Sequence, residues 1–341
     1  MAAVAEALRL RIPASSKNMN FLLKFRQRLG RSTNAAKEVC AITKTSHLLV
    51  PYFILDRWLS MKLYGTSPDS YMGLEFYNRR WWSKNKFLTD GRHSDLDEKF
   101  NSKEGIEILL DKHQFLKTYA PFVRRDWLFI DNDTPEAKID DFVSRHAECI
   151  AKPISSCHGN GVRKIKTDQI IQMKCNGEVF LAEEFISNCD KLKSLNPTSL
   201  NTIRVVTCRD HGGELHIMAI VMRIGGPDAV VDNYFGGGVA YHVNVEEGIV
   251  DYPGRNSKLE EFVRHPGSNV LMVGFQIPRF KELLTWIREV ADFRKDIRYA
   301  GWDVAITPEG FELVEGNNCP GPNIMQIHTQ KGLYNTLLKY L

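Results

Sequence analysis

Two short apolar runs near the C-terminus, joined by a turn, constrain the fold of this chain more than any other feature of its sequence. Residues 301–306 read Gly-Trp-Asp-Val-Ala-Ile, and residues 311–316 read Phe-Glu-Leu-Val-Glu-Gly. The residues between them, 307–310, read Thr-Pro-Glu-Gly, a composition typical of turns. Two apolar runs on either side of such a turn predict a β-hairpin.

Three side chains with oxygen atoms lie in or directly after this predicted hairpin. Asp303 belongs to its first strand, whereas Glu315 and Asn317 lie two residues apart in the second, so that their side chains share a face. Carboxylate, amide and phosphate oxygens are the ligands that a hard cation such as Mg²⁺ prefers. The hairpin therefore predicts a magnesium site, and a chain with such a site usually handles a nucleoside triphosphate. The alternative is an ordinary edge hairpin whose acids are solvated.

Length and composition set further bounds on the class of protein. The chain has 341 residues, enough for two domains or one elaborate domain. Its net charge of +4 is small for this length and gives no argument for nucleic acid as a partner. No apolar run approaches the ~18–20 residues of a membrane span, and Glu6 and Arg9 interrupt the apolar start that a signal peptide would need. Seven cysteines without a Cys-x-x-Cys pair favour reduced thiols and a cytoplasmic protein.

The first hundred residues differ in character from the rest. Leu22, Phe25 and Leu29 fall on one helical face with lysines and arginines around it, which predicts a basic amphipathic helix. Such a helix either packs on its own domain or contacts an anionic membrane surface. A second helix is predicted over residues 47–63. The aromatic residues between 71 and 82 predict packing in a core or at a domain interface, and the alternative is a platform on which sugars stack.

From about residue 106 the pattern changes to short apolar runs separated by polar turns, which predicts an α+β fold rich in antiparallel pairs. Strands are predicted over 127–131, 148–151, 178–186, 199–208 and 215–224, the last two joined at 210–213, and helices over 139–146 and 280–295. No internal repeat is present.

A lysine followed by a small, polar, glycine-containing loop is a candidate for phosphate binding. Lys152 ends a predicted strand, and residues 153–162 read Pro-Ile-Ser-Ser-Cys-His-Gly-Asn-Gly-Val. Such a loop can fold over phosphates with its backbone N–H groups while the lysine supplies a charge. It is not a P-loop, because the Gly-Lys-Ser/Thr ending is absent. Glu183 and Glu184 break the strand that follows. The alternatives are a structural turn and a strand end with solvated glutamates.

Two arginines lie in strands that are predicted to pair with each other. Arg204 belongs to one strand and Arg223 to the other, and Asn233 precedes the three glycines at 236–238. Two fork-shaped guanidinium groups on paired strands can clamp carboxylate or phosphoryl oxygens. The alternative is a pair of surface arginines in solvated ion pairs, which contribute ~0–1 kcal/mol each.

Together these pieces resemble the ATP-grasp superfamily in order and spacing as well as in residue type. The series runs from Lys152 and its loop, through the Glu-Glu-Phe-Ile segment and the two arginines, to Asp303 and Glu315-x-Asn317. The amino-acid ligase branch is similar in that its metal-binding Asp lies twelve residues before the Glu and that a Pro-Gly follows the Asn. Residues 64–71 resemble another branch, the sugar-transfer-associated ATP-grasp proteins. The resemblance covers residues 104–341 and, more loosely, 60–103.

The resemblance implies a role for each matching residue. It places Lys112, Lys152, Ser155, Ser156, Gly159, Gly161, Glu183, Glu184, Phe185, Ile186 and Asp190 at ATP, Asp303, Glu315 and Asn317 at Mg²⁺, and Arg204, Arg223 and Asn233 at the γ-phosphate and the acceptor carboxylate. The two lysines would contact phosphates, and residues 183–186 would form the adenine hinge. The ligase branch often has an acid before its Ile-Arg pair, whereas Thr202 stands here, so Asp190 or Asn201 is expected at the ribose.

The implied fold is the α+β ATP-grasp fold, in which two subdomains grip ATP, preceded by a helical N-terminal region. We expect residues 1–103 to form that region, on the acceptor or partner side, and 104–341 to form the ATP-grasp domain, with a lid at about 112–184 and a catalytic subdomain at about 187–341.

The implied activity is that of an ATP- and Mg²⁺-dependent carboxylate–amine ligase that works through an acyl phosphate. Its substrate would be a sugar acid or amino acid in surface-polysaccharide assembly, small or linked to a glycan, and no nucleic acid is expected. The alternatives are an ATP-grasp kinase that phosphorylates a hydroxyl, and a non-catalytic nucleotide-binding module of a glycan-assembly complex.

Overall fold

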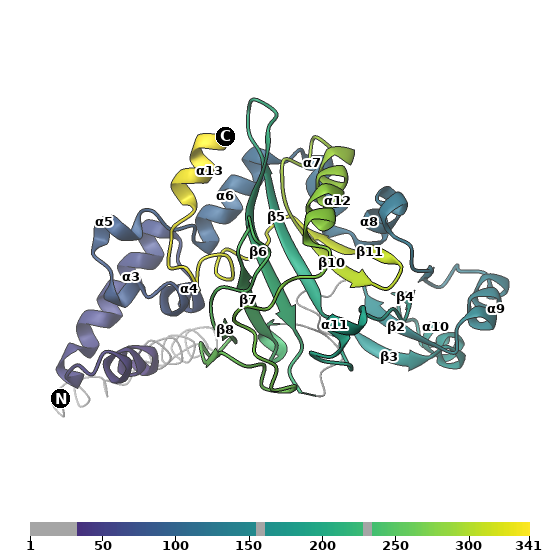
Figure 1. Ribbon diagram of the computed structural model, residues 1–341, viewed down its shortest axis with the longest axis horizontal. Coiled ribbons are helices and arrows are strands. Elements are labelled where there is room, and N and C mark those ends of the chain that lie inside the picture. The colour runs from purple at the N-terminus through teal and green to yellow at the C-terminus, as the bar shows by residue number, and fades with distance from the viewer. Residues whose placement is uncertain (1–32, 155–160, 228–233) are drawn as a thin grey trace, which may run out of the picture. The chain divides into compact units, whose positions relative to one another are not determined.

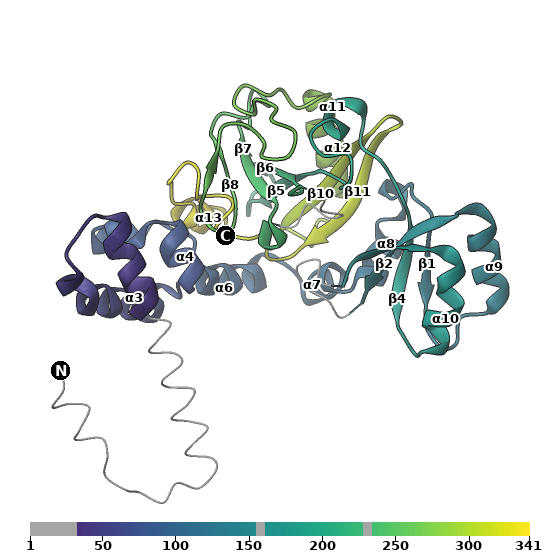
Figure 2. The same cartoon turned by 90° about the horizontal axis from the view of Figure 1, so that it is seen from below.

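The structure is a computed structural model that describes residues 33–154, 161–227 and 234–341 (Figures 1 and 2). The chain divides into two compact units, residues 1–79 and residues 80–341. The basic helix predicted around residues 22–31 lies outside the described residues. The functional division predicted at residue 103 is a different boundary and stays a prediction.

The described part of the first unit is helical. After a helical stretch at residues 33–42, it contains η2 (His47–Leu49), α3 (Val50–Tyr64), α4 (Pro68–Gly73) and η3 (Phe76–Asn78). Pro51 stands in the first turn of α3, where its missing N–H costs nothing, and Gly65 ends the helix in the left-handed region at φ 65°. The helix predicted over residues 47–63 is therefore confirmed.

Short helices open the second unit: α5 (Trp81–Lys84), α6 (Asp90–Phe100), α7 (Lys103–Leu110), α8 (Lys112–Thr118) and η4 (Ala120–Phe122). Asp111 caps α8, because its carboxylate accepts hydrogen bonds from the N–H groups of His113 and Gln114. This cap fixes Lys112 as the first residue of the helix.

A four-stranded antiparallel sheet follows, in the order β1-β4-β2-β3. Its strands are β1 (Trp127–Ile130), β2 (Glu148–Pro153), β3 (Arg163–Lys166) and β4 (Phe180–Glu184), and α9 (Glu136–Arg145), η5 (Thr167–Gln169) and α10 (Ile170–Cys175) accompany them. Ile139 and Phe142 of α9 and Ile170 of α10 pack into one apolar cluster with Cys149 and Ala151 of β2. The helices therefore cover one face of this sheet (Figure 2).

The second sheet has seven strands in the order β11-β10-β5-β6-β7-β8-β9, each pair antiparallel. Its strands are β5 (Thr202–Arg209), β6 (Leu215–Ile224), β7 (Val239–Val243), β8 (Gly254–Arg255), β9 (Glu261–Phe262), β10 (Tyr299–Thr307) and β11 (Gly310–Asn317); the remaining helices are α11 (Asp190–Lys193), η6 (Tyr234–Gly236), α12 (Phe280–Phe293) and α13 (Tyr334–Tyr340).

Both faces of the seven-stranded sheet are covered. Leu283 and Ile287 of α12 pack with Val205 and Trp302 on one face, and α12 lies along the strands in Figure 1. On the other face, residues of α6 and α13 share a cluster with Tyr299 of β10. Burial on both faces explains why every residue of β5 and β10 is buried.

The α+β fold class is confirmed, as are the strands and helices predicted after residue 106. The predicted hairpin at 301–316 is β10–β11, and the predicted pair at 199–224 is β5–β6. None of the described helices has the length and apolar character that crossing a membrane requires.

Candidate functional site

The β10–β11 hairpin brings Asp303 opposite Glu315, and Gly301 opposite Asn317. The pairing then shifts by one residue, from Asp303–Glu315 to Val304–Leu313, so that Val314 forms a β-bulge. In a regular strand, residues an odd number of positions apart point to opposite faces, but a bulge between them places both on the same face. Glu312 pairs with Ala305, two residues beyond Asp303, and it therefore lies on the same face as Asp303 and Glu315.

Asp303 is buried and held by two arginines. Arg204 of β5 donates from Nε to Oδ1 and from Nη2 to Oδ2, both at 2.7 Å. Arg223 of β6 contributes a second ion pair to Oδ2 at 3.1 Å. Burial raises the pKa of Asp303, but the charges of Arg204 and Arg223 outweigh burial and hold that pKa below its usual value.

Glu315 faces Asp303 across the hairpin and is partly buried. Burial raises the pKa of Glu315, and the negative charge of Asp303 raises it further. Asn317 adds an amide near the same place, because its Nδ2 lies 3.4 Å from Oδ2 of Asp303. Two carboxylates and an amide at one end of a hairpin form a donor set that fits a divalent cation, whose charge would relieve their repulsion. The structure thus brings the three predicted metal ligands together.

The two predicted phosphate-binding lysines lie at the same place. Lys152 of β2 forms an ion pair with Glu183 of β4, with Nζ 2.7 Å from Oε2, and Lys112 donates to the carbonyl oxygen of Pro153 at 3.2 Å. A small pocket contains both lysines; its lining residues are Leu109, Lys112, Phe115, Leu116, Lys152, Glu183, Val314, Glu315 and Gly316. Lysines from the four-stranded sheet and α8 therefore approach the carboxylate of Glu315.

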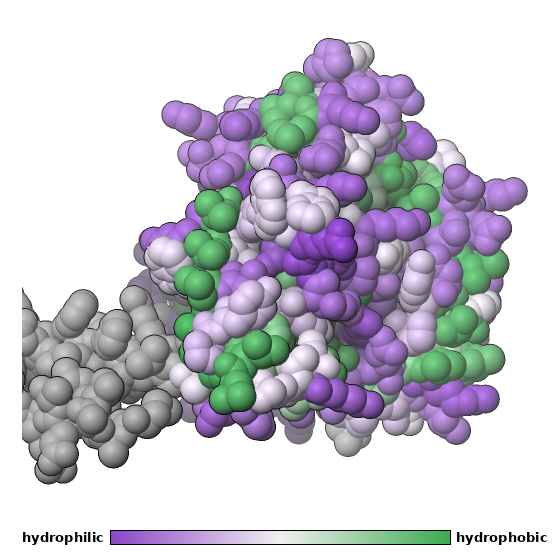
Figure 3. Space-filling model, turned by 90° about the vertical axis from the view of Figure 1, so that its left-hand side faces the viewer, coloured by the Kyte–Doolittle hydropathy of each residue, from purple (hydrophilic) through white to green (hydrophobic). Residues whose placement is uncertain are grey.

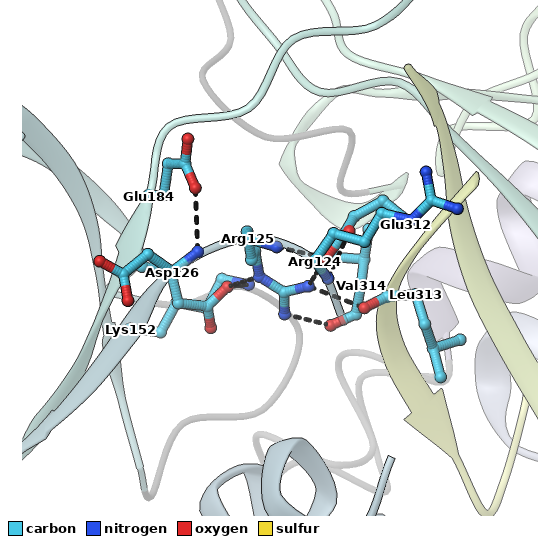
Figure 4. A network of polar contacts seen from close by, with 9 residues as sticks. Arg124, Arg125, Asp126, Lys152, Glu184, Glu312, Leu313 and Val314 are labelled. Carbon is cyan, nitrogen blue, oxygen red and sulfur yellow. Dashed lines mark hydrogen bonds and ion pairs between the residues drawn. The ribbon is translucent and has the colours of Figure 1, made fainter. Parts of the chain in front are cut away.

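Arg125, which the sequence analysis did not single out, joins the two sheets at this pocket (Figure 4). This buried side chain donates from Nε to Glu183 at 2.6 Å and from Nη1 to Glu312 at 2.5 Å. It also donates to the carbonyl oxygens of Leu313, at 2.7 Å, and of the bulge residue Val314, at 3.0 Å. Arg125 thus holds the strand that carries Glu315 and the glutamate that holds Lys152.

In this contact, opposite charges keep Arg125 and Glu183 ionised although both side chains are buried. Burial lowers the pKa of Arg125, but Glu183 and Glu312 raise it more, so the guanidinium remains charged. Burial likewise raises the pKa of Glu183, but Arg125 and Lys152 together bring it below its usual value. The signal for Arg125 in the sequence is weak, because an arginine beside another arginine before a strand is most often solvated.

The predicted hinge residues occupy the end of β4 and the segment after it. Glu184 accepts a hydrogen bond from the backbone N–H of Asp126 at 2.9 Å, and Phe185 is exposed, with the Lys164 ammonium 4.5 Å from its ring centroid. Ile186 is partly buried. The side chain of Glu183 is buried and binds Arg125 and Lys152. It therefore lies apart from the exposed side chain of Phe185.

Asp190 and Asn201 were the two residues expected at a ribose. Asp190 is the exposed first residue of α11. Asn201 is buried, and its amide donates to the carbonyl oxygens of Leu192 and Asn196 while its Oδ1 accepts from Ser199. Asn201 therefore holds the loop together, which leaves Asp190 as the candidate.

The remaining predicted residues belong to the two loops. Ser155, Ser156, Gly159 and Asn233 lie outside the described residues. Gly161 has φ +77°, and a Cβ there would lie 3.0 Å from Cγ of Pro153, so this position favours glycine. Arg204 and Arg223 lie on the adjacent antiparallel strands β5 and β6, which confirms that prediction.

Comparison with known proteins identifies the part of the chain that carries the two arginines and the β10–β11 hairpin. Residues 173–340 match the family model described as sugar-transfer associated ATP-grasp. The chain contains a sugar-transfer associated ATP-grasp domain. The resemblance drawn from its motifs is confirmed, and the fold is the ATP-grasp fold with a helical N-terminal region. A search of curated proteins gives no significant match.

Solved structures of ATP-grasp ligases are similar to this chain at low sequence identity and low TM-score. One is the ATP-grasp ligase PsnB complexed with a minimal precursor, Mg and ADP, with 14% identity and a TM-score of 0.41 over 70% of this chain and 61% of that chain. Another is D-alanyl-alanine synthetase A from Vibrio cholerae, with 17% identity and a TM-score of 0.42 over 68% of this chain and 63% of that chain. The chain thus spans about three fifths of the length of these structures.

Proposed function

We propose that this protein is an ATP-dependent carboxylate–amine ligase that works through an acyl phosphate. The arrangement around the β10–β11 hairpin is the observation that carries the proposal. Asp303 and Glu315 face each other across the hairpin. Lys152 approaches from the four-stranded sheet, and Arg204 and Arg223 approach from β5 and β6. Cations on both sides of paired carboxylates suit the transfer of a phosphoryl group between two anions.

The lysine side of the site is assigned to the nucleotide. Lys152 would leave Glu183 for an ATP phosphate, and Arg125 would remain as the partner of Glu183, so that no buried carboxylate is left unpaired. Asp303, Glu315 and the amide of Asn317 would hold Mg²⁺, which when bound neutralises charge on the β- and γ-phosphates.

The arginine side is assigned to the acceptor carboxylate and the γ-phosphate. A carboxylate oxygen of the acceptor attacks the γ-phosphorus and ADP leaves, which gives an acyl phosphate. An amine then attacks the carbonyl carbon, and inorganic phosphate leaves with the C–O bonding pair and takes up the proton that the amine nitrogen loses. Arg204 and Arg223 offer the fork-shaped donors that orient both oxyanions. The loop after Lys152 would close over the site and exclude water, which otherwise hydrolyses the intermediate.

The substrate class and setting are narrower parts of the same proposal. The name of the family, sugar-transfer associated ATP-grasp, supports a role beside sugar transfer, and within that setting we propose a sugar acid or amino acid of surface-polysaccharide assembly as the acceptor. The reaction is assigned to the cytoplasm, where ATP is available, and the six described cysteines carry free thiols. Within the chain, residues 104–341 would catalyse the reaction, and residues 1–103 would shape the acceptor or partner side.

Release of ADP during incubation with a panel of sugar acids and amines tests the proposal. A ligase needs both substrates for sustained turnover, and added hydroxylamine should trap the acyl phosphate as a hydroxamate. ADP release with hydroxyl acceptors and no hydroxamate would identify a kinase instead. No ADP release with any acceptor, together with tight ATP binding, would identify a non-catalytic module.

A matched pair of glutamate variants ties any activity to the hairpin. Glu315→Gln removes a proposed metal ligand and should lower the rate of ADP release by at least ~10-fold, more than it lowers nucleotide affinity. Glu309→Gln changes an exposed glutamate in the turn of the same hairpin and should turn over at the wild-type rate. Equal rates for the two variants would remove Glu315 from the site.

A further inference from the structure

Helix α3 of the first unit has apolar side chains around its whole circumference. Phe53 and Tyr64 are buried within the unit, but the opposite face of the helix is exposed. Leu48, just before α3, is 87% exposed and Leu63 at its end is 66% exposed. Figure 3 is a space-filling view of one face, and apolar side chains reach the surface in it.

The exposed side chains follow the spacing of a core-facing helix. Leu48, Tyr52, Leu55, Leu59 and Leu63 are separated by four, three, four and four residues, which places them in one stripe along the helix. All five are exposed; together we call them the α3 stripe. A contiguous exposed apolar surface of this kind marks an interaction site.

Charge indicates what covers the stripe. Residues 1–79 contain 12 lysines and arginines and 5 acidic residues, a formal charge of +7, whereas residues 80–341 contain 33 and 36, a formal charge of −3. Most of this positive charge lies in residues 1–32, which carry +6 and directly precede the described part of the unit; residues 33–79 carry +1. Such an asymmetry favours an anionic partner.

The residues beside the stripe show the same preference. Asp56, the acidic residue of α3, accepts a hydrogen bond from the Tyr71 hydroxyl at 2.7 Å and is thereby held within the unit. Lys62 is exposed next to Leu63, and Trp58 is exposed along the edge of the stripe. Tryptophan and tyrosine rings favour the boundary between lipid headgroups and acyl chains, and lysine reaches anionic headgroups from beside an apolar face.

We propose that the α3 stripe docks on the surface of an anionic lipid bilayer. The helix would lie in the plane of the membrane, with its leucines at the headgroup boundary and Lys62 among the headgroups. This inference is independent of the proposed ligase activity, because no residue of the stripe belongs to the site at the β10–β11 hairpin.

Sedimentation of the full chain with vesicles tests the proposal. Wild-type protein should bind vesicles of phosphatidylcholine with phosphatidylglycerol, and added salt should weaken this binding. The double variant Leu55→Glu/Leu59→Glu should bind these vesicles at least about tenfold more weakly. Leu338→Glu is the matched control: it changes a leucine of α13 that is 44% exposed, and it should bind as the wild type does. Circular dichroism checks that each variant folds.

Three results would overturn the proposal. Equal binding of wild type and Leu55→Glu/Leu59→Glu would remove the stripe from any membrane contact. Binding that survives in that variant but is lost in Arg26→Glu/Arg28→Glu would assign the contact to the basic segment before the described residues. An absence of vesicle binding, with a concentration-dependent dimer in the ultracentrifuge that Leu55→Glu/Leu59→Glu abolishes, would assign the stripe to a second copy of the chain.

Discussion

Replacement of Arg125 by alanine should destabilise the protein far more than the same replacement at its neighbour Arg124. Arg125 is buried between Glu183 and Glu312 and binds two carbonyl oxygens of β11 (Figure 4). Arg125→Ala would leave Glu312 without its ion pair and Glu183 with Lys152 alone. Removal of one partner from a buried ion pair costs ~3–5 kcal/mol.

The control rests on the different surroundings of Arg124. Its guanidinium donates one exposed hydrogen bond, to the carbonyl oxygen of Glu309 at 3.0 Å. The loss of such a contact changes stability by about 0.5 kcal/mol or less. The backbone N–H groups of Arg124 and Arg125 both face the Glu312 carboxylate, and both variants keep these donors. The pair of variants therefore isolates the buried guanidinium.

Urea denaturation measures the difference. Arg125→Ala should lose ~3–5 kcal/mol of unfolding free energy, which for a unit of this size lowers the melting temperature by roughly 6–20 °C. Arg125→Lys should recover only part of the loss, because an ammonium group lacks the planar, multiple donors with which the guanidinium reaches both glutamates and both carbonyl oxygens. If Arg125→Ala and Arg124→Ala unfolded within 1 kcal/mol of each other, the contact between the two sheets would contribute little and the reasoning would fail.

Three further predictions concern the site and its surroundings. Lys152→Ala should weaken ATP binding by about tenfold or more without unfolding the protein, since Arg125 still pairs with Glu183; unchanged affinity by calorimetry would contradict this. Arg223→Lys should lower the rate of ADP release by at least ~10-fold, or about 1.4 kcal/mol of barrier, and a wild-type rate would rule out a fork-shaped contact. Burial lowers the pKa of His93 to about 4, so the unfolded chain binds more protons between about pH 6.5 and 4, and stability should fall as pH drops through this window. His93→Gln should reduce that fall in urea midpoints measured at pH 7 and 5; an identical fall would exclude His93 as its source.

The elements of the fold were predictable because their signals are local. The apolar runs at 301–306 and 311–316 and the turn at 307–310 predict the β10–β11 hairpin, and the structure has it. Proline near the start and glycine after the end of α3 mark both limits of that helix. Such patterns depend on neighbours in the sequence, so they can be recognised without knowledge of the tertiary structure.

The polar contacts of the site were only partly predictable, because their partners are far apart in the sequence. Oxygen ligands at Asp303 and Glu315 follow from residue type and spacing, but the ion pair between Arg204 and Asp303 spans 99 residues. Arg125 meets Glu312 across 187 residues, and it also donates to the carbonyl oxygen of the bulge residue Val314. Only the packing of the two sheets reveals why an arginine is buried there.

A crystal structure with Mg²⁺ and a non-hydrolysable ATP analogue tests the central claim most directly. The account predicts a magnesium ion within about 2.0–2.1 Å of oxygens from Asp303 and Glu315, with Asn317 beside it and the phosphates against Lys112 and Lys152. A nucleotide bound elsewhere, or a metal held without contact to the β10–β11 hairpin, would contradict it.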